Sequence, residues 1–90
     1  MVHFLQLTHV DIVMKKPTYK EYYDAVVEDY RPSSMLTGEA FDQAIKENED
    51  VIEGDYRDFC MAIDDGYAEE MGWTLKGRAS ATSYNLYMLI

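Results

Sequence analysis

Cysteine is almost absent from this chain of 90 residues, which contains only Cys60, so an intramolecular disulfide framework is excluded. Proline and glycine are also few, with two and five copies, and no repeat or low-complexity linker divides the chain. Hydrophobic residues make up 48% of the sequence and aromatic residues 13%, a composition too apolar for a disordered chain. These features predict one folded domain over residues 1–90.

Motifs that carry catalysis or hold metal ions are missing as well. The chain has no CxxC, HExxH or HxxxH pattern for zinc and no glycine-rich phosphate loop. A calcium loop with glycine at its sixth position would place Val51 or Met61 at a position that needs an oxygen ligand. Cys60 falls on a predicted buried helix face beside acids, which disfavours a reactive thiolate. We therefore expect no metal, no cofactor and no enzymatic activity.

Basic residues are scarce, and this scarcity is uneven along the chain. Lysine and arginine number 8 against 17 aspartates and glutamates, which gives a net charge of −9. Residues 21–70 hold sixteen of the acids and only three of the bases, so the positive charges gather at the two ends. Such a segregation sets up a strong local field and repels nucleic acid, because phosphate contacts require a basic surface. Direct nucleic-acid binding is therefore not expected.

The N-terminal segment predicts a β-strand. Residues 2–14 are rich in Val, Leu, Ile, Phe and Thr, contain no glycine or proline, and stop at Lys15. The apolar stretch is short, is interrupted by His9 and Asp11, and lacks a small-residue cleavage site, so it predicts neither a signal peptide nor a membrane span. We expect a cytoplasmic protein without a membrane partner.

Three helices are predicted in the middle of the chain. Thr18 and Glu21 have the spacing of a capping box, and apolar residues recur at helical spacing from there until Pro32 ends the first helix. A short second helix is predicted from Glu39 to Asn48. A third is predicted to start at an Asp55 cap and to run to about Met71, with Gly66 as a possible break or close contact.

The last eighteen residues predict a β-hairpin with a turn through Lys76, Gly77 and Arg78. Tyr84 and the apolar residues at every second position after it would share one strand face. Together these segments predict an α+β fold, in which the N-terminal strand and the C-terminal hairpin form a small antiparallel sheet covered by the three helices.

The acids of the first and third predicted helices fall opposite the apolar stripes, with few bases near them. Ordinary solvated helices intersperse both signs, because opposite charges one turn apart attract by a few tenths of a kcal/mol. We interpret the arrangement as a contact surface for a basic protein, in which tyrosines at the edge of the stripe add rigid contact area. The predicted contact residues are Glu21, Asp24, Glu28, Asp55, Asp58, Asp65, Glu69, Tyr22 and Tyr30.

In size, charge and lack of catalytic residues, the chain resembles the small acidic inhibitors encoded by bacteriophages. These include DNA-mimic proteins that block restriction enzymes or CRISPR effectors. It is also similar in these properties to barstar-like and colicin-immunity inhibitors, which neutralise basic nucleases. The resemblance implies a partner that handles nucleic acid, in the host cytoplasm if the chain is phage-encoded, and it carries no site residues over.

Two other interpretations remain open. In one, the acidic residues only keep a tyrosine-rich domain soluble. In the other, the protein is a small structural or accessory protein that self-associates or joins an assembly through the apolar hairpin face that holds Tyr84, Leu86 and Met88.

Overall fold

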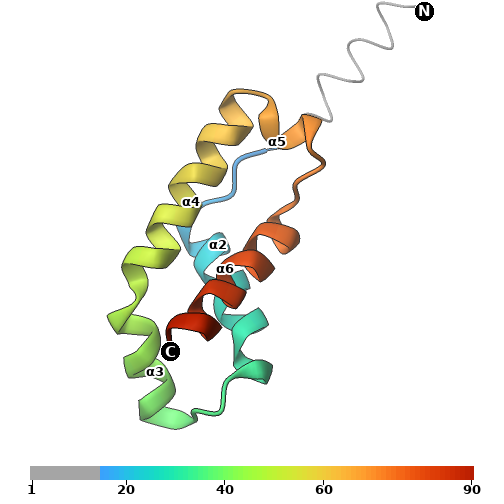
Figure 1. Ribbon diagram of the computed structural model, residues 1–90. Helices are drawn as coiled ribbons and strands as arrows, with labels where there is room; N and C mark the ends of the chain where they lie inside the picture. The colour runs from blue at the N-terminus through green and yellow to red at the C-terminus, as the bar shows by residue number, and fades with distance from the viewer. Residues whose placement is uncertain (1–14) are drawn as a thin grey trace, which may run out of the picture.

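A computed structural model of the protein describes residues 15–90 (Figure 1). Over these residues the chain forms helices and no strand, so the prediction of an α+β fold is wrong. The predicted N-terminal strand lies outside the described residues. The elements in chain order are α2 (Tyr19–Tyr30), the 3-10 turn η1 (Arg31–Ser33), α3 (Gly38–Glu47), α4 (Glu49–Asp64), α5 (Tyr67–Glu70) and α6 (Leu75–Leu89).

Helix α2 begins where the sequence predicts. The Thr18 side chain accepts a hydrogen bond from the Glu21 backbone N–H at 3.1 Å, and the Glu21 carboxylate accepts one from the Thr18 N–H at 2.8 Å. This reciprocal capping box satisfies two backbone donors that a helix start otherwise leaves unpaired. Pro32 lies in the 3-10 turn that follows, so the helix ends close to the predicted position.

Helices α3 and α4 follow one another with only Asn48 between them. The Asn48 side-chain amide donates to the Ala44 carbonyl at 2.8 Å, which satisfies one of the free carbonyls at the end of α3. Helix α4 then starts at Glu49, so Asp55 lies inside a helix and the prediction that it caps one is wrong. Two acids in the first turn, Glu49 and Asp50, favour this earlier start because they complement the helix dipole.

The long third helix that the sequence predicts is broken at Gly66. This glycine has a φ of +79°, a left-handed conformation that ends α4 and separates it from the single turn of α5. The prediction of a continuous helix to Met71 is therefore wrong beyond Asp64. Gly72, with a φ of +72°, reverses the chain after α5 as a helix terminator does.

The C-terminal segment is a helix and not a hairpin. The Thr74 hydroxyl accepts a hydrogen bond from the Gly77 N–H at 3.0 Å, so the predicted turn is instead the first turn of α6. The buried residues of α6 are Ala79, Thr82, Ser83 and Leu86, which recur at helical spacing. The hairpin prediction placed Tyr84 and Leu86 on one strand face. In the helix Tyr84 is exposed and Leu86 is buried.

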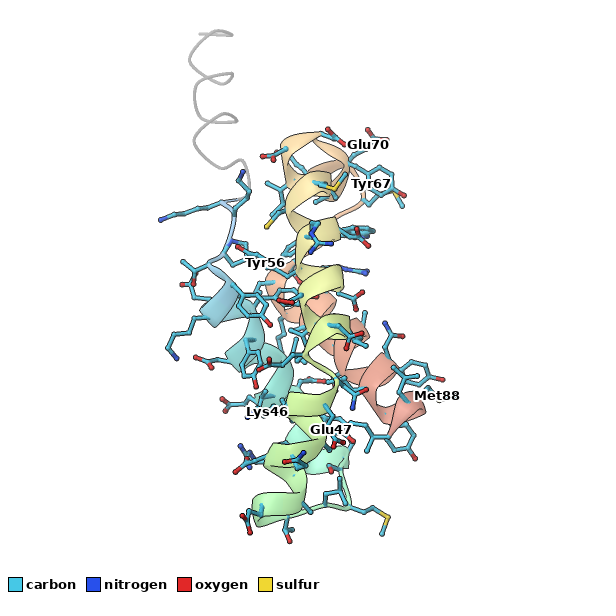
Figure 2. The ribbon with its side chains drawn as sticks, turned by 90° about the vertical axis from the view of Figure 1, so that its left-hand side faces the viewer. Lys46, Glu47, Tyr56, Tyr67, Glu70 and Met88 are labelled. Carbon is cyan, nitrogen blue, oxygen red and sulfur yellow. The ribbon has the colours of Figure 1, made fainter. Side chains whose placement is uncertain are left out.

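Three helices, α2, α4 and α6, pack against one another around the core. Figure 2 views the molecule with α4 toward the reader, and α2 and α6 emerge on opposite sides of it. The largest fully buried side chains come from these helices and α3; they are Tyr22, Phe41, Phe59, Ile52, Leu86, Val26 and Thr82. Burying an apolar side chain of this size contributes about 1.5–3 kcal/mol to folding, so these contacts fix the helix positions.

Candidate functional site: the acidic surface

The acids of α2 form a ridge on its outward face. Glu21, Asp24 and Glu28 are all exposed, and helical periodicity places them opposite the buried Tyr22 and Val26. The ridge is partly engaged by the chain itself. The Glu21 carboxylate belongs to the capping box, and Asp24 pairs with Lys20 one turn earlier at 2.8 Å. Both groups of that pair are well exposed, so water and salt screen it.

The acids of α4 form two rows rather than one. At 100° per residue, Glu49 and Glu53 lie on one flank of the helix and Asp55 and Asp58 on the other, with the buried Phe59 between them. The first flank faces α2, because the charges of Glu53 and Glu49 act on the α2 residue Tyr19. The second flank faces α6. The predicted acids Asp55 and Asp58 therefore lie on the flank of α4 that faces α6 and not on the flank beside Tyr19.

Asp55 is bound within the protein. Its Oδ2 atom accepts hydrogen bonds from the α6 residues Thr82, at 2.7 Å, and Asn85, at 3.2 Å. The Thr82 hydroxyl also lies 2.6 Å from the Tyr22 hydroxyl. Because the single Thr82 proton is directed at the carboxylate, Tyr22 is the donor in the second contact. Asp55 thus ends a chain of hydrogen bonds that joins α2, α6 and α4.

The two tyrosines predicted to contact a partner are in the core. Tyr22 is fully buried and Tyr30 is 2% exposed, so neither offers contact area at the surface. Burial raises the pKa of Tyr22 above its ordinary value, because the charged phenolate loses its hydration. Of the predicted acids outside α2, Asp58 is exposed on α4, Asp65 is exposed at its C-terminal end, and Glu69 is exposed on α5.

Two other tyrosines lie where α2 meets α4, and neither is among the predicted contact residues. Tyr19 and Tyr23 are half-buried, with ring centroids 5.9 Å apart. Tyr19 also contacts Tyr56 edge to face at 5.4 Å, and Tyr56 donates a hydrogen bond to the Pro17 carbonyl at 2.8 Å. This aromatic cluster extends from the surface to the core and holds its outer rings in fixed positions.

The charges of carboxylates from three helices act on these outer rings. Burial, followed by the charges of Glu53 and Glu49, raises the pKa of Tyr19 to about 12. The pKa of Tyr23 is raised by burial first and then by Glu49, with smaller effects of Asp24 on α2 and Asp42 on α3. We call this set the α2–α4 acidic surface; its members are Tyr19, Tyr23, Asp24, Asp42, Glu49 and Glu53.

The spacing of residues in the sequence could have predicted part of this surface. Glu49 and Glu53 are one helical turn apart, so a helix that starts at Glu49 places both on one flank. The predicted start at Asp55 left them outside a helix. Tyr19 and Tyr23 share the same spacing on α2, but their half-exposure depends on how closely α4 approaches, which no local pattern encodes.

Some positive side chains of the described residues pair with carboxylates or stack on rings, and one of them, Lys20, pairs with Asp24 of this surface. Lys16 pairs with Asp64 at 2.9 Å, and this contact raises the pKa of the lysine. The Arg31 guanidinium lies 4.5 Å from the Phe41 ring centre, and that of Arg78 lies 4.1 Å from the Trp73 ring centre. Stacking of this kind orders a guanidinium against an aromatic ring. Because residues 15–90 hold sixteen acids and eight bases, not every carboxylate can have a counter-ion of its own from the part of the chain described.

An open groove of about 670 Å³ runs beside the acidic ridge, between α2 and the start of α6. Its charged walls are Asp24, Glu28, Asp29 and Lys76, and its apolar floor includes Leu75. Over residues 15–90, no group of three or more His, Cys, Asp and Glu side chains is placed to hold a metal ion. Cys60 is a half-buried free thiol.

Comparison of the chain with protein-family models, with curated proteins and with solved structures gives no match. Within the described range, no helix has both the length and the apolar character needed to cross a membrane.

Proposed function

We propose that the protein is a non-enzymatic inhibitor or binding protein whose acidic surface occupies a basic groove of a nucleic-acid-handling protein. The observation that carries this proposal is the convergence of carboxylates from α2, α3 and α4 on two ordered tyrosine rings. Like charges gathered in this way repel one another and lower stability. A basic partner would relieve the repulsion. The arrangement is therefore better explained by a role in binding than by a role in stabilising the fold.

The α2–α4 acidic surface has the chemistry that a basic groove recognises. Carboxylates one helical turn apart, such as Glu49 and Glu53, stand about 5–6 Å apart and resemble the repeated negative charge of a nucleic-acid backbone. Tyr19 and Tyr23 add aromatic faces on which arginine side chains of a partner can stack. Tyrosine and arginine are also the residues that most often dominate the free energy of protein interfaces.

The proposal is supported by the charge of the whole chain. A net charge of −9, concentrated in residues 21–70, attracts a basic partner over a distance of about a Debye length, 8–10 Å at physiological salt. Attraction of this kind raises the association rate more than the intrinsic affinity, and it weakens as salt is added. Rapid, salt-sensitive binding is therefore the expected behaviour.

Charge reversal on the surface tests the proposal. A variant with Asp24→Lys, Glu49→Lys and Glu53→Lys is immobilised and exposed to a host-cell extract beside the wild-type protein. We expect the wild type to retain a basic protein that salt elutes, and the variant to lose it. Because all three side chains are exposed, circular dichroism should show the same helix content in both proteins.

A matched control separates local charge from net charge. The substitutions Glu39→Lys, Asp50→Lys and Glu70→Lys change the net charge equally, at exposed positions outside the α2–α4 acidic surface. This control should retain the partner. Equal loss in both variants, or a bound protein that high salt does not release, would refute the proposed surface.

A further inference from the structure

The last two turns of α6 expose apolar side chains on nearly all sides. In most surface helices apolar residues occupy one face, whereas those of this segment surround the helix axis. No charged residue occurs from Ala79 to Ile90. The exposed apolar side chains at this end of the molecule, which we call the α6 apolar end, are Met35, Tyr84, Tyr87, Met88, Leu89 and Ile90.

The exposed apolar area of this end, summed over all sides of the helix, is close to the area that one partner loses in a standard interface. Exposed fractions run from 44% for Ile90 to 96% for Met35. Because side chains of this size have roughly 200 Å² of surface each, the six expose on the order of 700 Å². A standard protein–protein interface removes about 800 Å² from each partner. Grooves of about 390 and 420 Å³ lie beside Tyr87 and enlarge the surface that a partner can fill.

The outward face of α6 is also complementary to itself. Gly77, Ala81, Tyr84 and Met88 are spaced by four, three and four residues, as apolar positions are in paired helices. The first two side chains are small and the last two are large and well exposed, at 62% and 65%. Figure 2 shows Met88 on the side of the molecule away from α2. One half of the stripe is therefore shallow and the other half protrudes.

An antiparallel pair of α6 helices would place the protruding half of each on the shallow half of the other. The midpoint between Gly77 and Met88 coincides with the midpoint between Ala81 and Tyr84, so a single twofold axis satisfies both contacts. Twofold symmetry of this kind closes the assembly at two copies, because each patch meets its own equivalent. A flat or uniformly bulky stripe would not offer this fit.

Charge argues against a lipid surface as the occupant. Membrane-bound amphipathic helices carry lysines and arginines on the polar side of their apolar face, which attract anionic lipids. The α6 apolar end has none within it, and the protein as a whole has a charge of −9. Two copies that meet through α6 instead place this uncharged end on the outward face of a second α6, where the stripe itself holds no charged residue.

We propose that the α6 apolar end and the stripe beside it form the interface of a homodimer, with the two α6 helices antiparallel. The homodimer does not depend on the function proposed above.

Sedimentation equilibrium over a wide range of protein concentration tests this interface. We expect the wild-type mass to rise from one chain to two and the dimer to persist in high salt. Met88→Glu should raise the dissociation constant by about tenfold or more, because it buries an unpaired charge in each half of the interface. Met61→Glu is the matched control, since Met61 is 57% exposed on α4, outside the patch, and should leave the dimer unchanged.

Ala81→Leu tests the packing arrangement. It fills the space assigned to the Tyr84 ring of the second copy, so it should weaken the dimer although it adds apolar surface. A wild type that stays monomeric at all concentrations overturns the proposal, as does a dimer equally sensitive to Met61→Glu. A tighter Ala81→Leu dimer overturns the antiparallel arrangement.

Discussion

The two flanks of α4 carry the same kind of side chain and use it differently. On the flank toward α6, Asp55 accepts hydrogen bonds from Thr82 and Asn85 and so helps to hold three helices together. On the flank toward α2, Glu49 and Glu53 are exposed and raise the pKa values of the neighbouring tyrosines, Glu49 through both its charge and a hydrogen bond to Tyr23. Carboxylate content alone therefore does not define a binding surface; the contacts of each group decide its role.

The largest effect expected from this comparison is on stability. Asp55→Ala should lower the free energy of unfolding by about 1–3 kcal/mol, because it removes the carboxylate that accepts hydrogen bonds from Thr82 and Asn85. Glu53→Ala removes an equal charge from the other flank and should change the free energy of unfolding by no more than about 0.5 kcal/mol. Urea unfolding measures both, and equal losses would remove the distinction between the flanks.

A double-mutant cycle sharpens the same contrast. Thr82→Val alone should cost about 1 kcal/mol, since Tyr22 can then direct its single proton to the Arg78 carbonyl, 3.2 Å away. In the Asp55→Ala background the same substitution should cost less, because the hydrogen bond between Thr82 and Asp55 is already lost. Additive losses in urea unfolding would show that Thr82 and Asp55 do not act as one hydrogen-bonded chain.

A smaller effect is expected at alkaline pH, and it concerns the other flank. The pKa of Tyr19 is raised from 10.0 to about 12, so between these values the folded protein binds more protons than the unfolded chain. Stability is therefore unaffected below pH 10 and falls as the pH rises from 10 toward 12. Glu49→Gln with Glu53→Gln should lower the pKa of Tyr19 and reduce this loss, as tyrosinate absorbance can measure. An unchanged titration would mean that the two carboxylates do not act on the ring.

The sequence predicts α2 well because its signals are local. The Thr18 capping box fixes the first turn, and the apolar stripe and Pro32 fix its face and its end. The same holds for the short helix α3, predicted from Glu39 to Asn48 and found at Gly38–Glu47 with Phe41, Ala44 and Ile45 buried.

The sequence does not predict helix α6, because its strand-like and helix-like patterns conflict. Tyr84, Leu86 and Met88 recur at every second position, as apolar residues do on one face of a strand, and Gly77 between charged residues suggests a turn. The competing helical signal is the spacing of Ala79, Thr82, Ser83 and Leu86; the first three have small side chains, which allow α2 to pack closely. Tertiary packing decides between the two patterns, as it often does for segments of weak propensity.

For the candidate site, too, local patterns and tertiary packing contribute differently. Counting charges along the chain places the acids in residues 21–70, and the helical period of α2 places three of them on one ridge. The division of the α4 acids into two rows depends on the start of that helix at Glu49, and the burial of Tyr22 depends on α6. Both are properties of how the helices pack.

Displacement by duplex DNA tests the central claim most directly. A partner captured by the wild-type protein in low salt is challenged with excess duplex DNA. A parallel sample receives free glutamate at the same total concentration of negative charge, and the amount of partner released is compared. If the acidic surface occupies a nucleic-acid groove, DNA should release the partner and glutamate should not. A partner that stays bound while it also binds the DNA would contradict the account.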